Sequence, residues 1–279
     1  METTREVGAL RDLVRSARGS GRTIGYVPTM GALHEGHLSL VRLARRESDF
    51  TVVSIFVNPL QFGPNEDLGR YPRKEADDAA ALASESVDVL YLPDAAEMYP
   101  PDFSTSVEVR GVSEGGEGET RPGHFRGVAT VVAKLFLQVS PDVAVFGQKD
   151  LQQVSVVRRM TRDLDFPIRL LVGPTVREPD GLAMSSRNAY LSPEERRVAA
   201  AFPRALFEAR DRAGRGERGA AELSENVRRE LRTARLDPDY VDVVDPETMA
   251  PVEIAAPGTA LLAAVRIGKT RLIDNVLVP

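Results

Sequence analysis

The first 175 residues alternate between short apolar runs and segments whose apolar residues recur at helical spacing. The apolar runs, each of about four to eight residues, predict strands at residues 23–27, 51–57, 87–92, 143–146 and 168–172. The helical spacing predicts helices at residues 7–17, 38–44, 73–84, 125–139 and 151–160. Several strands have no polar face, which is typical of a parallel sheet covered by helices on both sides. This alternation predicts an α/β domain.

The pattern changes after Pro174. Ser192-Pro193-Glu194-Glu195 is a capping box that predicts the start of a helix, and Pro203 is expected to kink that helix. Further signals predict a helix through Leu223, Val227 and Leu231 and strands at residues 240–244, 259–267 and 271–278. Helices followed by strands favour a small α+β domain. We therefore expect one domain at residues 1–175 and a second at 176–279.

The segment Gly111–Gly123 is rich in Gly and Glu. Such composition predicts a mobile surface loop without a function of its own.

Composition narrows the class of protein. The chain has 279 residues, of which 42% are hydrophobic and 28% charged, so it can bury a large core. Its net charge of −5 argues against an extended nucleic-acid interface. The absence of cysteine excludes disulfides, thiolate nucleophiles and Cys-ligated zinc. No signal peptide or membrane-spanning run is evident, so we expect a cytoplasmic protein.

Two of the three histidines lie three residues apart in Met30-Gly31-Ala32-Leu33-His34-Glu35-Gly36-His37. A predicted strand precedes this turn and a predicted helix follows it, which brings backbone N–H groups and a positive dipole end together. Because residues three apart on a helical turn share a face, both imidazoles can reach one anion, for which a nucleotide polyphosphate is the simplest candidate. Two alternatives stay open: the histidines only pack, or they bind zinc. The metalloprotease motif, however, has its two His at i and i+4, whereas here they are at i and i+3.

Other motifs suit the same ligand. Gly147-Gln148-Lys149-Asp150 follows a predicted strand, and ligands collect at the carboxyl ends of parallel strands. In Met184-Ser185-Ser186-Arg187, hydroxyls and a guanidinium can bind phosphate. The amides of Gln61 and Gln153 can recognise a hydroxyl or a carboxylate. Each motif taken alone has a plain alternative, namely a solvated Lys beside a helix cap, an ordinary turn, or a surface Gln. For His124, a structural and a catalytic role are both open.

Six stretches together resemble the pantothenate synthetase (pantoate–β-alanine ligase) family and follow its order. They are VPTMGALHEGHLSL (27–40), FVNPLQFG (56–63), RPGHFRG (121–127), FGQKDLQQ (146–153), VREPDGLAMSSRNAYL (176–191) and GKTRLIDN (268–275). The resemblance implies a Rossmann-like parallel sheet domain of the nucleotidyltransferase and class I synthetase type with a smaller C-terminal α+β lid domain. It also implies condensation of (R)-pantoate with β-alanine through pantoyl adenylate, with ATP and Mg²⁺, in a homodimer that binds neither nucleic acid nor membrane.

The resemblance also implies roles for individual residues. The expected catalytic residues are His37, His34 and Lys149. The expected ATP-binding residues are Met30, Gly31, Ala32, Leu33, His34, Glu35, Gly36, His37, Gly147, Gln148, Lys149, Asp150, Val176, Met184, Ser185, Ser186 and Arg187. The expected pantoate and β-alanine contacts are Gln61, Gln153, Asn58 and Tyr71. We expect no side-chain metal site, with Mg²⁺ held mainly through the ATP phosphates.

Different activities remain compatible with these motifs. One is a nucleotidyltransferase that shares the histidine turn, and another is a nucleotide sensor without catalysis. A tRNA synthetase fits less well, because the chain is acidic and has no evident RNA-binding extension.

Overall fold

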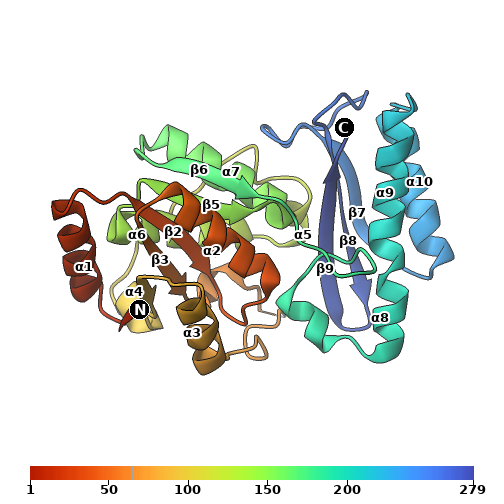
Figure 1. Ribbon diagram of the computed structural model, residues 1–279. Helices are drawn as coiled ribbons and strands as arrows, with labels where there is room; N and C mark the ends of the chain where they lie inside the picture. Colours follow the sequence, from red (N-terminus) through yellow and green to blue (C-terminus); the bar gives the residue numbers. More distant parts are fainter. Residues whose placement is uncertain (65) are drawn as a thin grey trace. The chain divides into compact units, whose positions relative to one another are not determined.

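The structure is a computed structural model that describes residues 1–64 and 66–279 (Figure 1). Its contacts divide the chain into two compact units. Unit 1 comprises Met1–Val109, Arg121–Gly147 and Val156–Pro174, and unit 2 comprises Arg110–Thr120, Gln148–Ser155 and Thr175–Pro279. The largest segment of unit 2 thus begins at Thr175, while two of its segments come from earlier in the chain. The division after residue 175 stays a prediction. In the described ranges no helix is long and apolar enough to cross a membrane.

Unit 1 contains the predicted parallel sheet. Its strands are β1 (Glu2–Thr4), β2 (Ile24–Thr29), β3 (Phe50–Ile55), β4 (Val89–Tyr91), β5 (Val143–Gly147) and β6 (Arg169–Gly173). Its helical segments are α1 (Val7–Gly19), α2 (Glu35–Glu47), η1 (Pro59–Gln61), α3 (Glu75–Ser84), α4 (Ala95–Met98), α6 (His124–Val139) and most of α7 (Leu151–Asp163). The predicted α/β class is confirmed.

The strand order is β1-β4-β3-β2-β5-β6, and all of these strands pair in parallel. From the centre, β2 leads to β3 and β4 on one side, whereas β5 leads to β6 on the other. The order therefore reverses between β2 and β5, which pair through Gly25 with Val143 and Tyr26 with Ala144. In open parallel sheets, ligands bind beyond the carboxyl ends of the strands at such a reversal.

Both faces of this sheet are covered, as the apolar strands predict. In β2, the neighbours Tyr26 and Val27 are both fully buried although their side chains point to opposite faces. Val27 belongs to an apolar cluster with α2 and α3. On the other face, Tyr26 packs edge-on against Phe136 of α6, whose ring also meets Phe146 of β5.

Unit 2 is built on an antiparallel sheet with strand order β7-β8-β9. The strands are β7 (Pro238–Val244), β8 (Ala260–Ile267) and β9 (Thr270–Leu277), and the helical segments are α5 (Glu117–Thr120), η2 (Gln148–Asp150), the start of α7, η3 (Ser186–Tyr190), α8 (Pro193–Ala199), α9 (Ala201–Gly214) and α10 (Ala220–Thr233). Helices α9 and α10 cover one face. On the other face, Leu151 packs with Tyr240, Leu262 and Ile273. The predicted small α+β architecture is confirmed.

Pro203 breaks its helix rather than kinking it. Helix α8 ends at Ala199 and α9 starts at Ala201. Proline lacks the N–H that would bond to the carbonyl four residues earlier, and its ring crowds that carbonyl, which here belongs to Ala199. The capping box at Ser192 is confirmed, since the Ser192 hydroxyl accepts from Glu195 N–H and the Glu195 carboxylate accepts from Ser192 N–H.

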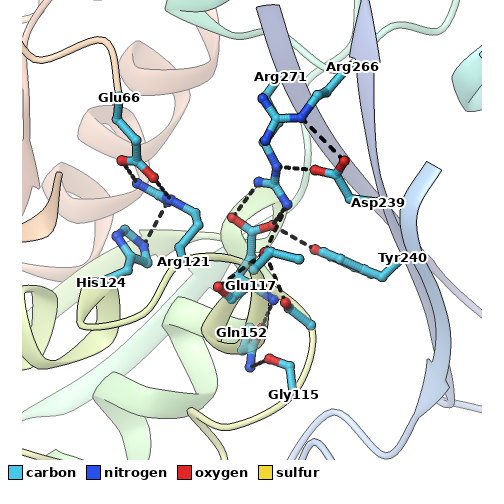
Figure 2. A network of polar contacts seen from close by, with 12 residues as sticks. Glu66, Gly115, Glu117, Arg121, His124, Gln152, Asp239, Tyr240, Arg266 and Arg271 are labelled. Atoms are coloured by element: carbon cyan, nitrogen blue, oxygen red, sulfur yellow. Dashed lines mark hydrogen bonds and ion pairs between the residues drawn. The ribbon is translucent and has the colours of Figure 1, made fainter. Parts of the chain in front are cut away.

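The prediction of a surface loop at Gly111–Gly123 is wrong at Val112, Gly116 and Glu117, which are buried. Glu117 is 5% exposed, and its carboxylate accepts hydrogen bonds from Arg271 and from the Tyr240 hydroxyl (Figure 2). Burial and then the Glu117 charge raise the pKa of Tyr240, so its hydroxyl stays protonated and can donate. Gln152 accepts from Glu117 N–H and donates to the Gly115 carbonyl. Composition alone could not reveal a partner 154 residues away along the chain.

Candidate functional site

The histidine turn forms the start of α2, immediately beyond β2. His34 is the N-cap of α2, so the helix begins three residues earlier than predicted and His37 lies in its first turn. The two imidazole rings have centroids 4.1 Å apart, which confirms that they share one face. His34 N–H donates to His37 Nδ1 at 3.3 Å. Since Nδ1 accepts, the proton of a neutral His37 lies on Nε2, which leaves that nitrogen as a donor.

A buried carboxylate holds the backbone of this turn. Asp78 of α3 is 3% exposed, and its two oxygens accept from Ala32 N–H at 2.8 Å and Leu33 N–H at 2.7 Å. Gly31 has φ +85°, and a Cβ there would lie 3.0 Å from the Asp78 carboxylate and 2.9 Å from Ile55. The turn therefore needs glycine at residue 31, and Asp78 keeps it in place. The sequence does not reveal this role of Asp78, because an acidic residue inside a helix pattern is typical of a solvated position.

Asn58, Gln61 and Met30 are in contact. Asn58 Nδ2 donates to Gln61 Oε1 at 3.0 Å, and Gln61 Nε2 lies 3.1 Å from Met30 Sδ. Asn58 is 1% and Gln61 9% exposed. Tyr71, also buried, packs edge-on against Phe62, which directly follows Gln61. The structure thus places a predicted ATP contact beside two predicted pantoate contacts.

Close approach of two backbones fixes where Gln61 lies. A Cβ on Gly127 of α6 would be 2.1 Å from the Leu60 carbonyl oxygen and 2.7 Å from Gln61 N. Only glycine allows α6 to pack so tightly on η1. The Gly127 carbonyl also accepts from Asn58 Nδ2 at 3.2 Å.

His124 and Arg121 reinforce the same segment (Figure 2). Arg121 can only donate, so His124 Nε2 accepts from it at 3.0 Å, and His124 Nδ1–H then donates to the Gln61 carbonyl at 2.9 Å. Arg121 also makes a bidentate pair with Glu66 at 2.7 Å. Partial burial opposes ionisation of Glu66, but the Arg121 guanidinium outweighs it and lowers the pKa of Glu66. These contacts give His124 a structural role at the Gln61 backbone.

In unit 2, Lys149 lies in η2, two residues beyond the end of β5. Its side chain is 21% exposed, and its ammonium lies 3.6 Å from the Asp150 carboxylate. Gln153 is half-buried in the first turn of α7. The side chain of Gln152, by contrast, serves the contacts with segment 110–120 described above.

The remaining predicted ATP residues belong to one hairpin and the turn after it. Met184 N–H donates to the Val176 carbonyl at 2.9 Å, so these two residues are direct neighbours across the hairpin. Ser185 is the N-cap of η3, and its hydroxyl accepts from Arg187 N–H at 3.3 Å. Asn188 donates to the Ala183 carbonyl and to Glu178, which ties the turn to the hairpin.

The structure therefore forms two groups of predicted site residues. In unit 1, the histidine turn follows β2, while Asn58 and Gln61 follow β3. Gly147 is the last residue of β5, which neighbours β2. Unit 2 contains the η2 turn, the hairpin and the Ser185–Arg187 turn. No group of three or more His, Cys, Asp or Glu side chains that could hold a metal ion occurs within residues 1–64 and 66–279.

Comparison with known proteins gives a consistent result over the whole chain. The family described as Pantoate-beta-alanine ligase matches residues 2–277. A pantothenate synthetase from Rhizorhabdus wittichii is 54% identical over 279 residues, covering 100% of this chain and 99% of its own.

Two solved structures are also similar. One is a pantothenate synthetase from Thermus thermophilus, with a TM-score of 0.95, 50% identity and coverage of 100% and 99% of the two chains. The other is a pantoate-beta-alanine ligase from Francisella tularensis, complexed with beta-gamma ATP and beta-alanine. It has a TM-score of 0.83 and 33% identity, covering 99% of this chain and 97% of its own.

Proposed function

The chain belongs to the pantoate–β-alanine ligase family, and from this premise we propose which of its residues carry out the ATP-dependent ligation of (R)-pantoate and β-alanine. In the first step, a carboxylate oxygen of pantoate attacks the α-phosphorus of ATP, and pyrophosphate leaves. In the second, the β-alanine amine attacks the acyl carbon of pantoyl adenylate, AMP leaves, and the nitrogen loses a proton. Adenylation is needed because a free carboxylate has no good leaving group.

The observation that carries the residue assignment is the paired imidazoles at the N-terminus of α2. They follow β2 at the reversal of strand order, where the helix dipole and backbone N–H groups favour an anion. Negative charge grows on the bridging oxygen and on pyrophosphate as the α-phosphorus bond breaks. His37 and His34 donate to that charge, which stabilises the transition state more than the ground state.

The other phosphate contacts come from Lys149, Ser185, Ser186 and Arg187. An ammonium supplies a point charge, whereas a guanidinium can bind two phosphate oxygens at once. The ATP site is lined by Met30–Gly36, Gly147–Asp150, Val176 and Met184. Of these, Val176 lies near the adenine. Pantoate binds to Gln61 and Gln153 through its hydroxyls and carboxylate, with help from Asn58 and Tyr71. The similar Francisella enzyme is complexed with beta-gamma ATP and beta-alanine, which supports a site for ATP and β-alanine in this chain.

As the family resemblance implies, Mg²⁺ would be held mainly through phosphate oxygens of bound ATP. Bound there, it would neutralise charge on the phosphates. The enzyme works in the cytoplasm as a homodimer on small substrates, and binds neither nucleic acid nor membrane. Residues 1–175 form the ATP- and pantoate-binding domain, and residues 176–279 form the lid domain.

Pyrophosphate exchange tests the proposed first step. Labelled pyrophosphate is expected to enter ATP when pantoate and Mg²⁺ are present and β-alanine is absent. Folded protein without exchange would contradict the adenylate route. AMP release that requires β-alanine separates the ligase from a nucleotidyltransferase, which would leave a stable nucleotidyl product. ATP binding without turnover on any substrate pair would indicate a sensor.

A further inference from the structure

The proposed function gives no role to the stretch GKTRLIDN (268–275). Its last residue, Asn275, is buried against the Lys149 turn. Asn275 is 1% exposed. Its Nδ2 donates to the carbonyls of Gln148 at 2.9 Å and Lys149 at 3.0 Å. Its Oδ1 accepts from Gln148 Nε2 at 3.2 Å. All of these contacts lie within unit 2.

This arrangement fixes the Asn275 amide in one orientation. An amide has two N–H donors, and here they face two successive carbonyls. A flipped amide would place its oxygen against both carbonyl oxygens and its nitrogen against the donating Gln148 amide. Holding two successive carbonyls restricts the backbone of η2, and with it the direction in which the Lys149 side chain leaves the main chain.

The backbone of Asn275 is itself held by a buried ion pair. Asp274 is 2% exposed and makes a bidentate pair with Arg177 at 2.6 and 2.9 Å. Asn275 N–H donates to Asp274 at 2.7 Å, and Arg177 donates to the Asn275 carbonyl at 3.1 Å. Arg177 also donates to the Gly181 carbonyl at 3.0 Å, across the hairpin that begins at Val176.

Burial against the small sheet keeps η2 in reach of Asn275. Asn275 and Ile273 lie two residues apart on β9, so their side chains point to the same face of the sheet. Leu151, directly after η2, packs on that face beside Ile273. The residue after the turn is therefore anchored by apolar contact while Asn275 holds the turn by hydrogen bonds.

We propose that Asn275 is a positioning residue for Lys149, and that the Asp274–Arg177 pair keeps Asn275 in register. The inference rests on the proposed contact between Lys149 and the phosphates of ATP. A displacement of about 1 Å at a reacting group can lower a rate roughly 100-fold. Loss of the Asn275 amide should therefore slow adenylation without removing any group that touches substrate.

The test is a double-mutant cycle measured by pyrophosphate exchange in the full chain. Asn275→Ala is expected to lower kcat by roughly 10- to 100-fold and to change the KM for pantoate by less than about twofold. Lys149→Ala is expected to lower kcat by about 100-fold or more. If Asn275 acts through Lys149, adding Asn275→Ala to Lys149→Ala should cost less than about a further twofold. Losses that multiply would overturn the inference.

Ser155→Ala is the matched control for general loosening of this segment. Ser155 is 1% exposed and donates to the Leu151 and Pro246 carbonyls, both of which lie outside η2. It should lower the melting temperature and leave kcat within about twofold of wild type. An equal loss of kcat in both single variants would reduce Asn275 to a structural residue.

Asn275→Ser is measured in the same cycle in case the alanine variant fails to fold. It keeps a polar group and leaves room for water at the buried site. If Lys149→Ala retains full activity, the Lys149 assignment and this inference both fail. If Lys149→Ala is impaired but the losses multiply, only the inference fails.

Discussion

At the scale of single residues, the predicted catalytic groups and the groups that hold them come from separate parts of the sequence. The spacing of His34 and His37 predicted that their rings share one face, and their centroids lie 4.1 Å apart. The role of Asp78 could not be predicted, since it depends on meeting two N–H groups more than 40 residues earlier in the chain. The histidine pair was predictable from chemistry, and its support was not.

Replacing His37 tests the assigned donor. His37→Ala should lower the rate of adenylation by about 100-fold or more, because one preorganised donor to the developing charge is lost. Pyrophosphate exchange at saturating ATP and pantoate measures this rate. An unchanged rate in the folded variant would refute the role.

Replacing Asp78 tests the support of the turn. Asp78→Ala removes both acceptors of Ala32 and Leu33 N–H and should lower the free energy of unfolding by about 3 kcal/mol. Adenylation should also slow, because the turn that positions His34 loosens. Asp77→Ala, at the exposed neighbouring position, is the control and should change neither urea unfolding nor exchange.

At the scale of elements, the helices and strands with clear periodicity were predicted almost throughout. The strand β1 was missed because three residues carry no pattern, and α4 was missed because it is a single turn. Glu117 was misread as a surface position, since its burial depends on Arg271 and Tyr240, which lie far along the chain. Local pattern predicts an element, whereas only the tertiary fold decides what buries a polar segment.

Gly127→Ala tests the contact between α6 and η1. The added Cβ would overlap the Leu60 carbonyl, so α6 must shift, at a cost of about 1–3 kcal/mol in stability. Displacement of Gln61 should also raise the KM for pantoate. Gly8→Ala in α1 is the matched control. Beyond its chain neighbours and the backbone of α1 itself, no atom lies within 4 Å of the added Cβ, so the change should stabilise by up to about 1 kcal/mol. Equal thermal shifts in the two variants would contradict this account.

At the scale of the whole molecule, each unit contains segments that are distant in sequence, and the hydrophobic pattern does not reveal this. The hydrophobic pattern predicted an α/β fold followed along the chain by a small α+β fold. It could not assign residues 148–155 to unit 2, because that depends on Leu151 joining the small sheet and on Asn275.

A fragment ending at Pro174 tests this organisation. It retains Glu117 and Gln152 but lacks Tyr240 and Arg271, so segments 110–120 and 148–155 lose their partners. Hydrogen exchange should be much faster in these two segments than in the full chain, while β2 and β3 keep greater protection. Equal protection of both segments in the fragment and the full chain would show that they fold without unit 2.

Acid stability should depend on Glu66. Its lowered pKa means that the folded chain holds the Glu66 proton less tightly than the unfolded chain does. The pair with Arg121 therefore stabilises the fold above about pH 4.5, and this contribution is lost as pH falls below that value. Urea unfolding of Glu66→Gln should show lower stability than wild type at pH 7 and a shrinking difference below pH 4.5. Glu222→Gln, at an exposed site, should show no such convergence.

The hydrogen bond from Asn275 to the Lys149 carbonyl spans 126 residues of chain. During translation, the lysine turn leaves the ribosome long before its partner on β9 has been made. The nascent polypeptide can therefore form the parallel sheet and the histidine pair early, whereas the lysine turn gains its Asn275 contacts only after β9 has been made. A chain released before β9 is made would lack these contacts, so we expect its lysine turn to be less ordered than in the full chain.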